Sequence, residues 1–487
     1  MLKTLEKPVE FSIYWIATLL AIVAIFAGVI LEEPLYFAVP VAFLFAYQMI
    51  VDFRVIFFLL LIATPFSIEY YSSSGFSTTL PTEPMMIIFM FTFIFFIFLK
   101  RELFDTGFFL HPLTIILYVH FAWMLVTTMF SEDIVISLKY MLAKTWYITT
   151  FYFMTSLVIK DIATFKKAFW CLFVPTLALT IYTLINHNKY HFAFSEVNKT
   201  MVPFFRNHVN YAVFLALMLP MLFSAYRWYP KNTWQRWIIQ FGIVVLIAGI
   251  YFSYTRSSWL SVAGATIAFF IIRMNKLVTS AVFAVFGVII FAIVMLHNNR
   301  YLDYAPDYKK TIYHTNFNEH MESTMSLEDV SSAERIYRWV AAIHMIEDKP
   351  YMGFGPGQFY FNYKEYTVNK FETYISKNPE RSTVHNYYLQ VTTEQGFPGT
   401  FVWVVLLIYT MYLGQRLYHR FTNIEYKHIS MSITLSIITI IINLALSDLV
   451  EADKIGTSFF MFLSLLVSFD LLLRRNPALS AEVPVKD

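Results

Sequence analysis

Residues 278–296 read VTSAVFAVFGVIIFAIVML and contain no charged side chain. An α-helix rises about 1.5 Å per residue, so about 20 apolar residues cross the hydrocarbon core of a bilayer. A helix also pairs its backbone polar groups within the segment, which lipid requires. This stretch therefore predicts a membrane-spanning helix.

Similar apolar stretches recur along almost the whole chain. Its 487 residues are 58% hydrophobic and 14% charged, whereas a soluble protein carries about 25% charged residues. We predict an all-α, polytopic transmembrane helical bundle of about 12 to 14 spans with one large, partly helical loop. The stretches expected to span are 12–31, 35–51, 53–66, 85–99, 113–130, 140–159, 167–185, 209–226, 237–253, 258–272, 278–296, 399–415, 429–447 and 456–473. We expect the first to be retained rather than cleaved as a signal peptide.

Basic residues near the ends of the stretches predict the orientation, because such residues stay in the cytoplasm. They gather on one side, as Arg273 and Arg420 illustrate. We therefore expect both termini in the cytoplasm and a large loop outside. The chain divides into an N-terminal bundle (1–296), this loop with catalytic elements (297–398), and C-terminal spans with a cytoplasmic tail (399–487).

The large polar loop contains one predicted helix and one tight turn. Ser331 and Glu334 fit a capping box, apolar residues follow at helical spacing, and Lys349-Pro350 ends the run. The turn Gly353-Phe354-Gly355-Pro356-Gly357 lacks the glycine spacing and preceding strand of a dinucleotide site.

Arg256 lies in a very short outer link between two apolar stretches. An arginine near hydrocarbon usually faces a cavity and pairs with another group. The alternative is that it extends to lipid phosphates. We favour a functional role.

Further candidates lie at the outer end of an earlier stretch and in the loop. Arg206, His208 and Asn210 precede or begin the stretch 209–226. Ordinary solvation is an equal alternative for Arg206, and it is the favoured one for His208 and Asn210 taken alone. Arg335 lies one helical turn before Trp339, and for this residue taken alone we favour stacking on that indole over a functional role.

His385 lies where the loop returns to the membrane. A histidine near its usual pKa of about 6.5 is available as a neutral base, although it could equally be an interfacial side chain. Glu394 follows nine residues later, half a helical turn out of register, so we do not expect it to orient the imidazole.

Other ionisable groups are weaker candidates. We expect Lys139 and Lys144 to extend outward, and Asp448, Glu451 and Asp453 to form a solvated acidic turn. The sequence has no HExxH and no paired Cys or His at zinc spacing. We therefore predict a site without metal or cofactor.

Taken together, three arginines and one histidine surround one outer loop. A guanidinium matches phosphate oxygens with a planar set of donors. Several guanidinium groups with one neutral imidazole suit the displacement of a pyrophosphate leaving group, which needs a base and charge neutralisation. The net charge of +3 is too small to suggest nucleic acid as a partner.

Four stretches, in order, resemble the O-antigen ligase and polymerase superfamily of bacterial membrane glycosyltransferases. They are Asn207-His208-Val209-Asn210-Tyr211-Ala212, Thr255-Arg256-Ser257-Ser258-Trp259-Leu260, Arg335-Ile336-Tyr337-Arg338-Trp339 with Asp348–Gly355, and His385-Asn386-Tyr387-Tyr388-Leu389-Gln390 with Gly396 and Gly399. The resemblance covers about residues 205–400.

The resemblance implies an inverting, metal-independent transfer of a glycan from undecaprenyl pyrophosphate, at the periplasmic face of the bacterial inner membrane. By matching motif, Arg256 and Arg335 would hold the pyrophosphate, and His385 would activate the acceptor hydroxyl. The remaining substrate-binding residues that it implies are Arg206, His208, Asn210, Arg338 and Asn386.

Several functions stay open. A ligase would move a finished glycan to lipid A–core, a polymerase would use a glycan acceptor, and transfer to protein is a third variant. We favour the ligase. A transporter or flippase for lipid-linked glycans is the alternative from another class, although such proteins place ionisable residues near the membrane midplane.

Overall fold

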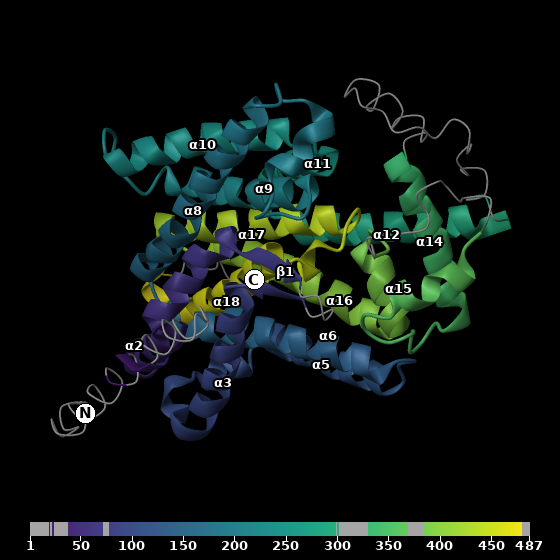
Figure 1. Ribbon diagram of the computed structural model, residues 1–487, viewed down its shortest axis with the longest axis horizontal. Helices are drawn as coiled ribbons and strands as arrows, with labels where there is room; N and C mark the ends of the chain where they lie inside the picture. Colours follow the sequence, from purple (N-terminus) through teal and green to yellow (C-terminus); the bar gives the residue numbers. More distant parts are fainter. Residues whose placement is uncertain are drawn as a thin grey trace, which may run out of the picture. The chain divides into compact units, whose positions relative to one another are not determined.

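The computed structural model describes residue 19, residues 22–23, 38–71, 77–298, 300, 330–368 and 383–479 (Figure 1). Nearly all of the predicted span 12–31 and much of the large loop lie outside the described residues. The chain forms two compact units, residues 1–63 and 64–487, and each is considered separately.

The first unit is described mainly through helix α2 (Ala38–Phe66), which continues into the second unit. Asp52 interrupts the helix with φ −153° and ψ 93°, and its carboxylate accepts a hydrogen bond from the Arg54 amide at 3.0 Å. Two helical segments therefore meet in a kink at Asp52, which is the boundary between the predicted stretches 35–51 and 53–66.

The second unit is helical apart from one antiparallel hairpin, β1 (Ile68–Tyr71) and β2 (Ser77–Leu80), which pairs Ile68 with Leu80. Its helices are α3 (Thr82–Leu99), α4 (Thr106–Phe109), α5 (Pro112–Met129), α6 (Ile134–Tyr147), α7 (Thr155–Val158), α8 (Ile162–Asn188), α9 (His208–Ala225), α10 (Trp234–Phe252), α11 (Arg256–Arg273), α12 (Leu277–Leu296), α14 (Val330–Asp348), α15 (Phe359–Asn362), α16 (Tyr387–Arg420), α17 (Ile424–Leu444) and α18 (Asp453–Arg475).

Nine helices of the described part are long and apolar enough to cross a membrane. They are α3, α5, α8, α9, α10, α12, α16, α17 and α18. The predicted fold class, an all-α polytopic membrane protein, is confirmed. The predicted span 140–159 begins earlier, at Ile134, and runs from α6 through a π-helical turn (Ile148–Met154) into α7.

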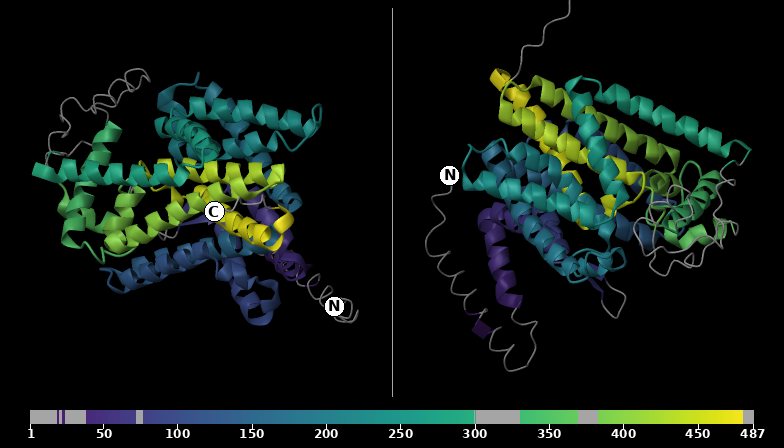
Figure 2. Two further views of the ribbon diagram at one scale, coloured as in Figure 1. Left: turned by 180° about the vertical axis from the view of Figure 1, so that it is seen from behind. Right: turned by 90° about the horizontal axis from the view of Figure 1, so that it is seen from above.

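Helix α17 lies at the centre of the second unit and packs against α9, α11 and α16. The right-hand view of Figure 2 shows α12, α16 and α17 running roughly parallel to one another. Ser436 on α17 donates to the Leu217 carbonyl of α9 at 2.7 Å. The approach of α16 is so close that a Cβ at Gly414 would lie 2.0 Å from the Thr434 hydroxyl, so only glycine fits there.

The two ends of this bundle differ in charge. At one end, which we call the basic end, His419 of α16 contacts the Ile272 carbonyl of α11 at 2.7 Å, and Asp470 of α18 pairs with Arg474 at 2.7 Å. The opposite end, the site end, brings together the starts of α9, α11, α16 and α18, as the contacts described below establish.

Helix α16 begins twelve residues before the predicted span 399–415 and breaks in its third turn at Gly396, where φ is 70° and ψ −179°. The break exposes three carbonyl groups, and each finds another donor. Thr393 and Glu394 accept from the amides of Phe354 and Gly355 at 3.0 and 2.9 Å, and Gln395 accepts from the Trp123 indole at 2.8 Å.

The predicted turn 353–357 is confirmed and supplies two of these donors. Gly353, Gly355 and Gly357 all have positive φ. A Cβ at Gly353 would lie 2.4 Å from the Glu394 backbone carbon. The turn therefore needs glycine both for its conformation and for its close approach to α16.

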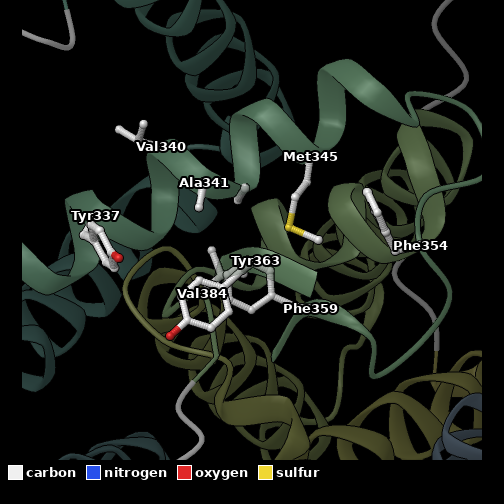
Figure 3. Close-up of a cluster of buried hydrophobic side chains, with 9 residues drawn as sticks. Tyr337, Val340, Ala341, Met345, Phe354, Phe359, Tyr363 and Val384 are labelled. Carbon is white, nitrogen blue, oxygen red and sulfur yellow. The ribbon is translucent and has the colours of Figure 1, made fainter. Parts of the chain in front are cut away.

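The predicted loop helix is α14, and its apolar face covers a small core of its own (Figure 3). Tyr337, Val340, Ala341 and Met345 from α14 face Phe354, Phe359, Tyr363 and Val384. The predicted capping box was wrong: Ser331 lies inside the helix, which already includes Val330. A helical residue is not an N-cap, because the cap has non-helical dihedral angles.

Candidate functional site

His385 lies between the loop core and the first turn of α16. Val384, directly before it, is fully buried in that core, and Asn386, directly after it, is the N-cap of α16 and accepts from the Leu389 amide at 3.1 Å. The half-buried His385 has φ 56°, a left-handed conformation that costs about 1–2 kcal/mol in a residue other than glycine. Both neighbours thus fix a strained backbone.

Three arginines act on this histidine. Burial lowers the pKa of His385, and the positive charges of Arg338, Arg335 and Arg206 lower it further, to about 3. Each effect disfavours the charged imidazolium. The imidazole is therefore neutral at physiological pH, and the three guanidinium groups surround it closely enough to influence its protonation.

Two of these arginines, Arg335 and Arg338, lie on α14 about one helical turn apart. Arg338 is 5% exposed and pairs with Glu334, which is 4% exposed, at 3.1 Å. Glu334 thus binds a side chain one turn ahead and does not serve the predicted capping box. This spacing of four residues was a sequence signal for the pair that the capping interpretation overlooked.

Arg206 comes from a separate segment, just before α9. Asn207 caps α9 by accepting from the Asn210 amide at 2.9 Å. His208 contacts the side-chain oxygen of Asn198 through both its amide (3.0 Å) and Nδ1 (2.8 Å). Asn198 was not a sequence candidate, and it fixes the imidazole orientation of His208.

Arg256 is the first residue of α11, and this helix start lies against the start of α9. The Thr255 hydroxyl donates to the His208 carbonyl at 3.3 Å, and the Tyr254 hydroxyl donates to the Phe192 carbonyl at 2.6 Å. Arg256 is therefore grouped with His208 at the site end. It is not among the three arginines that lower the pKa of His385.

Glu394 supports the loop turn, in keeping with the expectation that it does not orient His385. Its carboxylate accepts from the Phe359 amide at 3.3 Å and from the Gly357 amide. It is 2% exposed. The residue ties the glycine turn to the broken part of α16.

The predictions for Lys144 and the acidic turn need correction. Lys144 is 6% exposed and pairs with Glu451 at 2.8 Å, so it does not extend outward. Glu451 also accepts from Tyr140 at 2.6 Å, and Asp453 accepts from Tyr147. These carboxylates bind side chains and are not simply a solvated turn.

Throughout the part of the chain that the structure describes, no group of three or more His, Cys, Asp and Glu side chains is arranged to hold a metal ion. The positive charge near His385 comes from guanidinium groups.

Residues 241–404 match the family model of the O-antigen ligases. The chain is thus similar to the O-antigen ligases over this one domain. This domain covers about one third of the 487 residues and includes Arg256, Arg335, Arg338, His385 and Asn386, whereas Arg206, His208 and Asn210 precede it.

A search of curated proteins found no match to this chain. The similarity of residues 241–404 to O-antigen ligases points to an enzyme of the membrane glycosyltransferase class, and the apolar helices of the described part are those of a multi-pass membrane protein.

Proposed function

We propose that the chain is an inverting, metal-independent glycosyltransferase that moves a glycan from undecaprenyl pyrophosphate to an acceptor hydroxyl, as an O-antigen ligase acting on lipid A–core. The observation that carries this proposal is the neutral imidazole of His385 beside the charges of Arg338, Arg335 and Arg206. The base and the anion-binding groups that the reaction needs are thus neighbours.

In the proposed reaction the acceptor oxygen attacks the anomeric carbon from the side opposite the pyrophosphate. His385 takes the hydroxyl proton, the bond between the anomeric carbon and pyrophosphate breaks, and pyrophosphate leaves with the bonding electrons. Arg335, Arg206 and Arg256 neutralise the leaving-group charge. Arg338 shares its charge with Glu334, so we assign it a smaller part.

The arginines also make the base responsive to the donor. With the site empty, the pKa of His385 is about 3, which makes the imidazole a weak base. A bound pyrophosphate brings negative charge among the same arginines and raises the pKa of His385. Because a general base works best with a pKa near the operating pH, donor binding prepares the base for transfer.

We further propose that the site end faces the periplasm of a bacterial inner membrane and that both termini are cytoplasmic. Arg227, Arg273 and Arg416 follow or end helices at the opposite end of the bundle. Basic residues at helix ends favour the cytoplasmic side.

Transfer by purified protein tests the proposal. In detergent, without an ion gradient and with EDTA present, we expect transfer from a lipid-linked glycan to lipid A–core. His385→Ala should lower the rate by about 100- to 10,000-fold, the usual contribution of general-base catalysis. Near-normal transfer by the folded variant would reject His385 as the base.

His344→Ala is the matched control, because His344 lies on α14 and contacts the Tyr366 carbonyl at 3.2 Å within the same loop core. We expect transfer by this variant to stay within a few-fold of the unsubstituted protein. A transporter would move the lipid-linked glycan without transferring it.

Glycolipids of a null strain separate the two closest alternatives. Core without glycan, together with accumulated lipid-linked polymer, supports the ligase. Core bearing a single repeat identifies a polymerase and rejects the ligase assignment.

A further inference from the structure

Lys454 is a buried cation at the site end that the proposed chemistry does not use. It lies in the first turn of α18 and is 7% exposed. Lys199, a lysine in the same region of the molecule, has 67% of its side chain exposed and pairs with Glu196. The burial of Lys454 therefore needs a separate explanation.

The ammonium of Lys454 binds backbone carbonyls from two separate segments. Its Nζ donates to the carbonyls of Pro65 at 2.8 Å and Ser67 at 3.0 Å, and also to that of Phe204. A lysine ammonium has three protons and no acceptor, so three carbonyls satisfy it fully. It also lies 4.1 Å from the centre of the Phe205 ring, where the π face attracts a cation.

The segment that Lys454 holds leads directly to Arg206. The Phe204 ring packs edge-on against Phe66 and Tyr182 at centroid distances of 5.9 and 5.6 Å. The Phe205 ring packs against Tyr211 at 5.4 Å. Asn207 then caps α9, so the exposed Arg206 has a fixed residue on each side.

We propose that Lys454 is a positioning residue: its ammonium holds the Phe204–Phe205 segment so that Arg206 is presented to pyrophosphate beside His385. This inference rests on the proposed function, because it assigns Arg206 to the pyrophosphate. The long side chain of an arginine can adopt many positions, and it loses this freedom when it binds an anion. Because the backbone of Arg206 is already fixed, less conformational entropy is lost on binding.

Binding of farnesyl pyrophosphate to the full-length protein in detergent tests this role without requiring the natural glycan. Arg206→Ala should weaken binding about ten-fold or more, as expected for loss of one hydrogen-bonded charge. Lys454→Met keeps the aliphatic stem, removes all three donors, and should weaken binding by a similar factor. The double variant should bind no more weakly than Arg206→Ala alone.

Lys199→Met is the matched control, since it removes an exposed positive charge from the same region, and its affinity should stay unchanged. Lys454→Arg replaces Lys454→Met as the test variant if Lys454→Met does not fold. A planar guanidinium cannot donate hydrogen bonds to the three carbonyls in the geometry that an ammonium allows. We therefore expect Lys454→Arg to bind farnesyl pyrophosphate more weakly, although it keeps the positive charge. Gel filtration and thermal melting confirm folding.

The pH profile of transfer gives a second measurement. Moving Arg206 away from His385 raises the pKa of the imidazole, so Lys454→Met should shift the acid limb of kcat/KM upward, as Arg206→Ala does. The other charges facing His385, Arg335 and Arg338, are unchanged in both variants.

The outcomes separate the two proposals. If the unsubstituted protein does not bind farnesyl pyrophosphate, the proposed function fails. If it binds and Arg206→Ala weakens binding, but folded Lys454→Met or Lys454→Arg binds normally, only the role of Lys454 is rejected. A further loss in the double variant likewise rejects action through Arg206.

Discussion

His385 combines two unfavourable features that a purely structural residue would not need. Its backbone is in the left-handed region, and its side chain lies among three cationic groups. Both cost free energy, and strained residues gather at functional sites because surrounding packing maintains them. Here the packing comes from buried Val384 and from the Asn386 cap.

Charge removal near His385 should change the pH dependence of transfer. With the pKa of His385 at about 3 in the donor-free protein, the imidazole is neutral above that pH, so kcat/KM should show no acid limb near pH 6.5 from this group. Arg335→Gln removes a positive charge that disfavours the imidazolium. The pKa of His385 should therefore rise, and the acid limb of kcat/KM should move to higher pH.

Lys189→Gln provides the control for Arg335→Gln, because Lys189 is exposed and contacts the Asn186 side chain at 2.9 Å. Its pH profile should match that of the unsubstituted protein. An unchanged acid limb in Arg335→Gln would contradict the electrostatic coupling.

At the scale of elements, the broken helix α16 connects the loop to the bundle. Its first turns carry the residues after His385, and the break at Gly396 turns backbone groups toward the loop. The Phe397 amide donates to the Pro350 carbonyl at 2.9 Å. The loop is thus attached to the helix by main-chain hydrogen bonds, which side-chain substitutions leave in place.

Gly396→Ala should destabilise the protein by about 2–4 kcal/mol, because alanine does not tolerate φ 70° with ψ −179° and its Cβ would lie 2.1 Å from the Tyr351 carbonyl oxygen. Thermal melting in detergent measures this loss. Gly287→Ala is the matched control, since a Cβ at Gly287 in α12 meets nothing within 4 Å. Equal melting of the two variants would show that the break is not needed.

At the scale of the whole molecule, the candidate residues lie at one end of the bundle and clustered basic residues at the other. Thr255 joins the starts of α11 and α9, and Lys454 joins the start of α18 to the segment before α9. This arrangement predicts that one aqueous compartment supplies the acceptor while the opposite end meets the cytoplasm.

Cysteine labelling tests this orientation. In a Cys171→Ala background, which removes the single cysteine, Lys189→Cys should react with a membrane-impermeant maleimide in spheroplasts. Lys231→Cys, exposed in the link between α9 and α10, should react only after permeabilisation. The reverse pattern would invert the proposed topology.

Much of the helical architecture was predictable because long apolar stretches report directly on helices in lipid. The loop helix was also predictable from its spacing. The boundary at Asp52 between the stretches 35–51 and 53–66 was predictable as well, whereas the dihedral angles that form the kink there were not. Glu334 was predicted as part of a cap, and its actual partner is Arg338.

The sequence by itself determined the membrane class, the loop helix and the candidate set, because hydrophobicity and local spacing are properties of neighbouring residues. Only the tertiary structure decided that Arg206, Arg335 and Arg338 act together on His385, and that Lys144 and Lys454 are buried with partners. Those relations join segments far apart in the chain, and packing of helices, which no local pattern encodes, brings them together.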